Sequence, residues 1–230
     1  MEIFCQQTLL IDADDTLWEN NIYFERVIES VQSLLAPFGI APGIFRERLD
    51  ALECEHIPVH GYGTVNFCRS LLEAFTTFLP GADHAGLGKR VEALALGILS
   101  QPVQVIEDVP ETLEYLAPRH SLYLVTKGNA KEQASKIESS SLANKFRGIE
   151  ILEEKNSGTY CRLIQRHGWE PSKTWMVGNS PRSDINPAIR AGMNAVFIPH
   201  AHTWVLEHEE PVQHSRVLAL EKFAHLRRHF

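Results

Sequence analysis

Thr8-Leu9-Leu10-Ile11-Asp12-Ala13-Asp14-Asp15-Thr16-Leu17-Trp18 is the stretch from which the fold is predicted. Its apolar run predicts a buried strand over 9–11, and a buried strand cannot keep unpartnered carboxylates in the interior. We therefore expect the strand to end at Asp12, in a crevice at the carboxyl edge of an open α/β sheet, where such sheets bind ligands. In an extended chain Asp12 and Asp14 point the same way, and they repel each other unless a cation lies between them or one keeps its proton. The stretch therefore predicts a functional site.

The composition is that of an ordinary globular protein. The 230 residues are 44% hydrophobic and 22% charged, and the net charge of −7 argues against a nucleic-acid partner. No apolar run approaches the roughly 18 residues of a membrane span, and the N-terminus lacks the pattern of a signal peptide. The four scattered cysteines are typical of free thiols in a reducing compartment. We expect a cytoplasmic monomer or homodimer that binds neither membrane nor nucleic acid.

A helical pattern follows the first strand. Between residues 20 and 99, apolar side chains recur at helical spacing in four segments, with short links and no strand pattern between them. The second segment, residues 44–57, is expected to stop at Pro58. The link that follows, residues 59–64, places His60 and Tyr62 beside two glycines. We predict that residues 20–99 form a helical bundle inserted into an α/β domain made of residues 1–19 and 100–230.

The remainder of the chain alternates between helix and strand. Strands are expected at 122–125, 148–152, 174–177 and 195–198, each separated from the next by a helical segment. The helical segment after residues 174–177 is expected to run from Asp184 to Ala191. Strict alternation of this kind predicts βαβ units on a parallel sheet. The expected fold is therefore a doubly wound, Rossmann-like parallel sheet with an inserted helical bundle. The tail from 211 to 230 adds one short strand and a helix.

Four motifs at the expected strand ends resemble those of the haloacid dehalogenase superfamily. They are Asp12-x-Asp14-x-Thr16, Thr126, Lys155, and Gly178-Asn179-Ser180 with Asp184. Each motif alone would be weak, but four in order over essentially the whole chain are specific. The predicted bundle also occupies the position of that family's helical cap.

The resemblance implies a reaction at phosphorus. In this family's phosphatases, Asp12 would be the nucleophile that forms an aspartyl-phosphate, and Asp14 would act as general acid and base. Thr126 and Lys155 would hold the phosphoryl oxygens. Mg²⁺ would bind the Asp12 side chain, the Asp14 backbone carbonyl and the acidic motif. That motif contributes Asn179 and Asp184.

Other residues are assigned to substrate binding. Lys127, Gly128 and Asn129 open a helix whose N-terminal amides suit an anion. His60 and Tyr62 lie in a glycine-flexed loop of the kind that can close over a crevice. An ordinary connection between helices explains that loop equally well.

Asp14 separates the two main activities of the family. Dehalogenases attack carbon, need no metal and lack an acid at this position, whereas a phosphatase must protonate an alkoxide leaving group. The sequence therefore predicts a Mg²⁺-dependent phosphomonoester hydrolase that acts on a small phosphorylated metabolite. A phosphosugar mutase on the same fold is one alternative. A catalytically weak protein that binds a phosphorylated ligand is another.

Two residues depart from the family pattern. Asp15 replaces the usual glycine, and we interpret it as a turn residue directed toward solvent or the bundle. Asn179 replaces an acid, and an amide oxygen brings no charge to a metal.

Three further positions have structural alternatives. Lys155 could be a solvated surface lysine beside two glutamates, and Asp184 could be the N-cap of its helix. His200-x-His202 lacks a tetrahedral set at zinc spacing, which is typical of surface histidines.

Overall fold

The chain divides into two compact units in a computed structural model that describes residues 4, 6–81 and 85–230. One unit comprises Met1–Glu19 and Val103–Phe230, and the other comprises Asn20–Pro102. Cys5 lies outside the described residues, and Cys54, Cys68 and Cys161 are free thiols.

The first unit has α/β architecture. Its strands are β1 (Thr8–Ile11), β2 (Ser121–Lys127), β3 (Gly148–Leu152), β4 (Thr174–Gly178), β5 (Asn194–Phe197) and β6 (Val217–Ala219). Its α-helices are α5 (Val109–Leu116), α6 (Ala130–Ser140), α7 (Ser157–His167) and α8 (Asn186–Arg190). Shorter turns are η4 (Ala143–Lys145), η5 (Pro171–Lys173), η6 (Pro181–Ile185), η7 (Val205–Glu207) and η8 (Phe223–Arg228).

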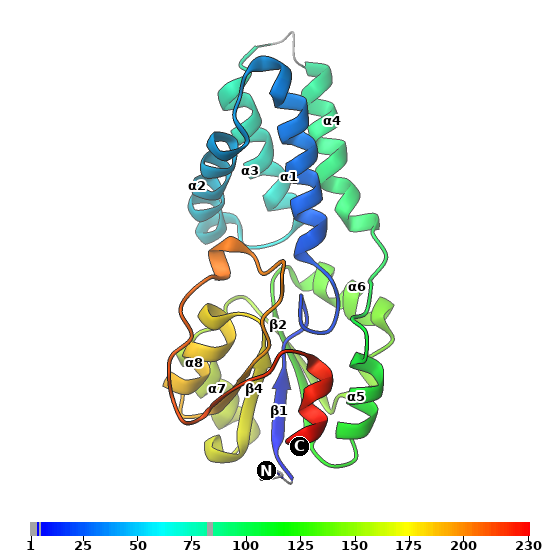
Figure 1. Ribbon diagram of the computed structural model, residues 1–230, viewed down its shortest axis with the longest axis vertical. Helices are drawn as coiled ribbons and strands as arrows, with labels where there is room; N and C mark the ends of the chain where they lie inside the picture. Colours follow the sequence, from blue (N-terminus) through cyan, green and yellow to red (C-terminus); the bar gives the residue numbers. More distant parts are fainter. Residues whose placement is uncertain (1–3, 5, 82–84) are drawn as a thin grey trace. The chain divides into compact units, whose positions relative to one another are not determined.

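All six strands form one parallel sheet in the order β3-β2-β1-β4-β5-β6. The first strand is central, with Ile11 in register with Leu124 of β2 and with Val177 of β4. The chain therefore winds outward from β1 in both directions, and the carboxyl ends of β1, β2 and β4 meet at one edge (Figure 1). The predicted doubly wound parallel sheet is confirmed.

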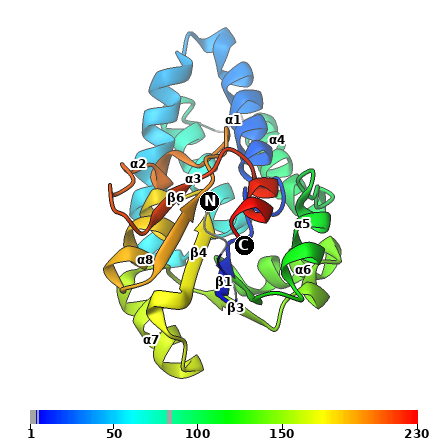
Figure 2. The same ribbon diagram turned by 60° about the horizontal axis from the view of Figure 1, so that its bottom comes forward.

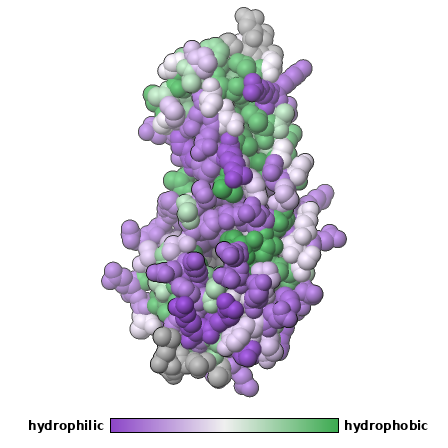
Figure 3. Space-filling view, turned by 45° about the vertical axis from the view of Figure 1, so that its right-hand side comes forward, coloured by the Kyte–Doolittle hydropathy of each residue, from purple (hydrophilic) through white to green (hydrophobic). Residues whose placement is uncertain are grey.

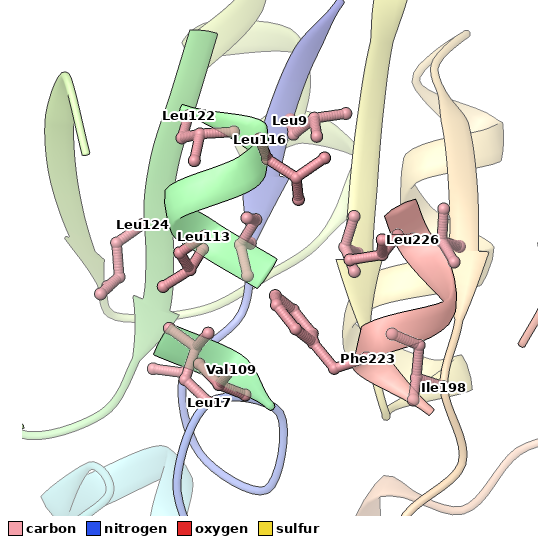
Figure 4. Close-up of a cluster of buried hydrophobic side chains, with 14 of the residues drawn as sticks. Leu9, Leu17, Val109, Leu113, Leu116, Leu122, Leu124, Ile198, Phe223 and Leu226 are labelled. Carbon is pink, nitrogen blue, oxygen red and sulfur yellow. The ribbon is translucent and has the colours of Figure 1, made fainter. Parts of the chain in front are cut away.

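The alternation of side chains along β1 builds two hydrophobic layers. Leu9 and Ile11 join a cluster with Leu113 of α5 and Leu226 of η8, whereas Leu10 joins a cluster with side chains of α7 and α8. Figure 4 shows the first cluster, with the leucines of α5 beside those of β1 and β2. Figures 1 and 2 show α5 and α6 on one side of β1, and α7 and α8 on the other. Because both faces of β1 are covered, its polar side chains can lie only at its ends.

The second unit is the inserted helical bundle. Its helices are α1 (Asn21–Leu35), α2 (Pro42–His60), α3 (Thr64–Phe78) and α4 (Ala85–Leu96), with short turns η1 (Ala36–Phe38) and η3 (Gly97–Ser100). A separate apolar cluster that includes Val31, Phe45 and Leu71 fills its interior. On its surface, Arg46 pairs with Glu25 at 2.7 Å.

The end of α2 corrects one sequence expectation. Pro58 was expected to stop this helix at Ile57, but the helix continues to His60. A proline in the last turn removes only one backbone hydrogen bond, so the turn can form around it. The helix ends instead at Gly61, whose φ of 74° is the left-handed conformation that favours glycine.

The structure also corrects the expected bounds of the helix that follows β4. A single helix was expected from Asp184 to Ala191, but the segment begins with a π-helical turn, η6, and only then becomes α8. Ser180 caps this turn by accepting a hydrogen bond from the Ser183 amide at 2.9 Å. The chain therefore begins to coil three residues after β4, earlier than its apolar spacing indicates.

Polar side chains cover much of the surface that Figure 3 shows, with smaller hydrophobic areas between them. No helix among the described residues has the length and apolarity that crossing a membrane would require.

Two residues of the sheet test how much burial in the core contributes to the free energy of unfolding. Leu124 is fully buried, and its register partner Ile149 on the neighbouring strand is 41% exposed. Leu124→Ala should lower the free energy of unfolding by about 2–5 kcal/mol, because it removes apolar contacts and leaves a cavity. Ile149→Ala should cost clearly less in the same denaturant titration. Equal losses would contradict the difference in burial between these two side chains.

Candidate active site

The polar residues that follow β1, β3 and β4 meet at the carboxyl edge of the sheet. Asp12 follows β1 directly and its amide donates to the carbonyl of Val177 on β4 at 2.9 Å. Because β1 lies between β2 and β4, the loops after these strands surround the Asp12 side chain.

Lys155 joins two of the predicted site residues. Its ammonium donates to Oδ1 of Asp12 and, at 2.8 Å, to Oδ1 of Asp184. All three side chains are buried, with Lys155 only 2% exposed. The alternative of a solvated surface lysine is therefore wrong, because the chain after β3 turns this side chain inward.

The second oxygen of each carboxylate, Oδ2, also accepts a hydrogen bond. Asp12 Oδ2 accepts a hydrogen bond from Thr16 Oγ1 at 3.0 Å, and Asp184 Oδ2 accepts one from the amide of Ser180 at 3.0 Å. Asp184 is thus inside the turn that Ser180 caps, and the alternative in which Asp184 is the N-cap is wrong. Both carboxylates have fixed orientations.

Gly178 leaves the space that Asp184 occupies. A Cβ atom added at Gly178 would overlap the Asp184 carboxylate and lie 2.9 Å from its Cβ. The last residue of β4 must therefore lack a side chain for Asp184 to reach Lys155.

Burial raises the pKa of Asp12 to about 7. The Lys155 ammonium opposes this shift, and the nearby Asp184 carboxylate adds to it. The pKa of Lys155 is raised by the two carboxylates, which outweigh the effect of burial on the ammonium. Two carboxylates thus share one ammonium, and the site carries an excess of buried negative charge.

Asp14 has a different environment. Its carboxylate accepts hydrogen bonds from Lys136 Nζ at 2.6 and 2.7 Å, from Gln133 Nε2 at 2.8 Å and from Trp18 Nε1 at 2.7 Å. Burial acts to raise its pKa, but the Lys136 charge and these hydrogen bonds outweigh burial, and the pKa is lowered. A carboxylate held in this way is ionised at neutral pH and suits a base.

Thr126 and Asn179 lie beside this centre. Thr126 is buried at the penultimate position of β2, two residues beyond the register partner of Ile11. The Asn179 amide oxygen lies 3.5 Å from Thr16 Oγ1, and its Nδ2 donates to Thr203 Oγ1 at 2.9 Å. Asn179 thus links the loop after β4 to the Asp12 loop and to the segment after β5.

The structure gives the segment after β2 other roles besides the predicted substrate contacts. Lys127 pairs with Glu207 at 2.6 Å and donates to Ser183 Oγ at 2.9 Å. Asn129 caps α6, because its side-chain oxygen accepts from two amides of the first turn. Gly128, with φ of 135°, donates its amide to the carbonyl of Leu152. Substrate binding by these three residues remains a prediction.

Glu207 is a site residue that the sequence did not reveal. It accepts hydrogen bonds from Lys127 and, at 2.5 Å, from Ser180 Oγ, and it is only 12% exposed. Burial acts to raise its pKa, but Lys127 and the serine hydroxyls outweigh burial and lower it. Glu207 is the last residue of η7, in a segment without the apolar periodicity that would predict its contacts. For Lys136 and Gln133 the sequence gives a weak indication of a shared role, since their spacing puts them on one face of the helix that follows Thr126.

Asp15 and His200 also come together. His200 lies 3.7 Å from Asp15 and 3.4 Å from Glu19. Asp15 is buried, and its φ of 59° is left-handed, so the expectation that it turns toward solvent is wrong. Ligand atoms of these three residues lie within 4.8 Å of one another, and they form a His-carboxylate cluster among the described residues.

His60 and Tyr62 belong to the helical unit. His60 is the last residue of α2, and its Nε2 lies 2.7 Å from Nη1 of Arg69. Tyr62 lies in the short link between α2 and α3. Their predicted contact with substrate remains a prediction.

The donor set at the sheet edge fits Mg²⁺. Asp12, Asp184, Asn179 and the Asp14 carbonyl all offer hard oxygens, which this ion prefers. The two buried carboxylates already converge on one positive charge, and a further cation would balance the negative charge that remains. Magnesium would supply electrostatic stabilisation of the charge that develops on a phosphoryl group.

A family model for haloacid dehalogenase-like hydrolases matches residues 6–192, which include all the motifs at the sheet edge. The chain belongs to the haloacid dehalogenase-like hydrolase family. A comparison with curated proteins finds no match.

Solved structures of this family share the fold. A haloacid dehalogenase-like family hydrolase from Xanthomonas campestris is 26% identical, with a TM-score of 0.84 over 99% of this chain and 94% of that one. A putative hydrolase of the family from Bacillus subtilis, bound to magnesium, is 17% identical, with a TM-score of 0.67 over 98% of both chains. A 2-haloacid dehalogenase from Pseudomonas syringae is 23% identical, with a TM-score of 0.60 over 97% of both.

The ion pair of Glu207 predicts a pH-dependent contribution to stability. Its pKa is lowered below the ordinary 4.5, so the contribution is present above that value and is lost as the pH falls through the lowered pKa. Glu207→Gln should lower the free energy of unfolding by about 2 kcal/mol at pH 7. The difference from wild type should shrink on acidification in urea titrations.

Glu209 provides the control for this experiment, because it is 41% exposed and lies 3.6 Å from its partner Arg190. Glu209→Gln should change stability by less than about 0.5 kcal/mol. A Glu207→Gln effect that persists unchanged in acid would show that the pKa of Glu207 is not lowered by folding.

Gly178 provides a steric test. Gly178→Ala should lower the free energy of unfolding by about 1–3 kcal/mol, because the new methyl group displaces the Asp184 carboxylate from Lys155. Gly88 in α4 has open space around its Cβ position, so Gly88→Ala should instead stabilise by about 0.5–1 kcal/mol. Thermal and urea unfolding would measure both. A neutral Gly178→Ala would contradict the close packing of Asp184 on β4.

Proposed function

We propose that the protein is a Mg²⁺-dependent phosphomonoester hydrolase that works through an aspartyl-phosphate on Asp12. The observation that carries the proposal is the pair of carboxylates after β1, with Asp12 beside Lys155 and Asp184, and Asp14 two residues later. A nucleophile alone serves dehalogenation, whereas cleavage of a phosphate ester also needs a group that handles protons.

In the first step, a carboxylate oxygen of Asp12 bonds to phosphorus while the bond from phosphorus to the ester oxygen breaks. Thr16 and Lys155 hold the two Asp12 oxygens, which fixes the direction of attack. Lys155 also offers an ammonium to the phosphoryl oxygens, and Thr126 a hydroxyl donor. Asp14, which is ionised at neutral pH, relays to the leaving oxygen the proton that the monoanionic form of the phosphate ester carries.

In the second step, water attacks the phosphorus of the aspartyl-phosphate, and phosphate leaves as the Asp12 carboxylate is regenerated. Asp14 accepts the proton of this water. Its hydrogen bonds to Lys136, Gln133 and Trp18 support that role, because they favour the ionised carboxylate.

The proposed substrate is a small phosphorylated metabolite in the cytoplasm. A helical unit that closes over the site would exclude water and large polymers, and His60 and Tyr62 would then contact the substrate. We further propose that the protein acts as a monomer or homodimer and binds neither nucleic acid nor membrane.

A phosphate-release screen over phosphorylated metabolites tests the proposal. Wild type should release phosphate with Mg²⁺ and stop when a chelator is added. Asp12→Asn should lower the rate by at least about 10⁴-fold, since loss of a covalent nucleophile removes the intermediate. Turnover that survives either the chelator or the substitution would refute the mechanism.

The same preparation should be offered 2-chloropropionate, with release of chloride as the readout. Chloride release that survives the chelator, with no phosphate release from any ester, would identify a dehalogenase instead. Binding of phosphorylated ligands without turnover would identify a binding protein.

A further inference from the structure

The carboxylate of Asp14 is surrounded by donors from two different parts of the chain. Trp18 Nε1 donates from the loop after β1, and Gln133 and Lys136 donate from α6, more than a hundred residues away. Gln133 and Lys136 are three residues apart, so they project from one face of the helix toward the same point. We define Trp18, Gln133 and Lys136 as the Asp14 clamp.

The position of Gln133 depends on the backbone after β2. Gln133 is buried, and its Nε2 donates both to Asp14 and, at 2.9 Å, to the carbonyl of Lys127. A Cβ atom at Gly128 would lie 3.0 Å from this Nε2. Gly128 therefore leaves room for an amide that ties the end of β2 to Asp14, and α6 is fixed relative to the β1 loop.

Lys136 makes the shortest contact of the clamp, at 2.6 Å to Asp14 Oδ1. It bonds both oxygens of Asp14, which fixes the plane of the carboxylate as well as its position. Lys136 and Asp14 are 24% and 22% exposed, so solvent screens the pair only in part.

We propose that Lys136 is a positioning residue for Asp14, which aims this carboxylate at the oxygen that gives or takes the proton. The inference rests on the proposed phosphatase reaction. Without Lys136, Asp14 keeps Trp18 and Gln133 but loses the two contacts that set its plane. Loss of Lys136 should therefore slow proton transfer by Asp14 and leave the attack of Asp12 on phosphorus unchanged.

Leaving groups of different basicity separate this role from a structural one. An alkyl phosphate needs a proton on its leaving oxygen, whereas p-nitrophenolate leaves without one. Lys136→Met should lower kcat/KM for an alkyl phosphate by about 10²-fold and change kcat/KM for p-nitrophenyl phosphate little, because this ratio excludes the hydrolysis of the aspartyl-phosphate that both substrates share. Lys136→Arg should restore most of the lost turnover, since a guanidinium can bond both carboxylate oxygens.

The control is Lys131→Met, which removes an exposed lysine from the same helix and should change neither substrate. Equal losses on both substrates would overturn the proposal in favour of a structural role. A faster alkyl phosphate reaction would also overturn it, because Lys136 would then act only by opposing protonation of Asp14. No change on either substrate would likewise overturn it.

A readout without turnover keeps the test independent of the proposed function. The indole N–H resonance of Trp18, assigned with Trp18→Phe, reports its hydrogen bond to Asp14. In ¹H–¹⁵N spectra it should shift in Lys136→Met, return in Lys136→Arg and stay in place in Lys131→Met. An indole signal that does not move in Lys136→Met overturns the positioning role. Absence of phosphate release by wild type would refute only the proposed function.

Discussion

The ammonium of Lys155 between Asp12 and Asp184 is the interaction on which the rest of the α/β unit depends. Taking three charges out of water costs several kcal/mol for each ion, and the cost is offset only when the partners meet with good geometry. The three residues follow three different strands, so the order and register of the sheet must be correct before any of them is paired. Gly178 and the Ser180-capped turn both serve this requirement, because they place Asp184.

The segment after β5 closes the same region from the other side. Thr203 accepts from Asn179, His200 lies beside Asp15, and Glu207 pairs with Lys127. These contacts use polar side chains only, which explains why the segment has no apolar pattern of its own. Buried polar groups of this kind must be satisfied together, since one unpaired member costs more than its hydrogen bond contributes.

The sequence was sufficient for the sheet and for the residues at its edge. Parallel strands bring their carboxyl ends to one side, so polar residues that follow apolar runs must meet there, as Asp12, Lys155 and Asp184 do. It was insufficient for contacts between loops, such as the one that pairs Lys127 with Glu207 across 80 residues. Periodicity reports which face of an element is buried, but it does not report the partner of a single charged side chain.

Asn129 and Lys136 show a second reason why the sequence did not predict every contact of the site. Asn129 was assigned to substrate from its position at a helix start, where a side-chain cap fits the same pattern. Lys136 lies on a helix that was predicted only as the link between two strands, yet its charge reaches Asp14. In both cases the sequence element was correct, and the direction of one side chain decided its role.

Asp12 and Asp14 are two residues apart and have opposite environments. Burial beside Asp184 raises the pKa of Asp12 to about 7, whereas Lys136 and two further donors lower the pKa of Asp14. Pairs of carboxylates whose environments push their pKa values apart are how one site divides two chemical roles. The difference between the two environments follows from neighbours in the loop after β3, in η6 and on α6, rather than from the motif itself. A chain with the same Asp-x-Asp motif but without Lys136 would therefore keep the contacts of Asp12 and lose the order around the second carboxylate.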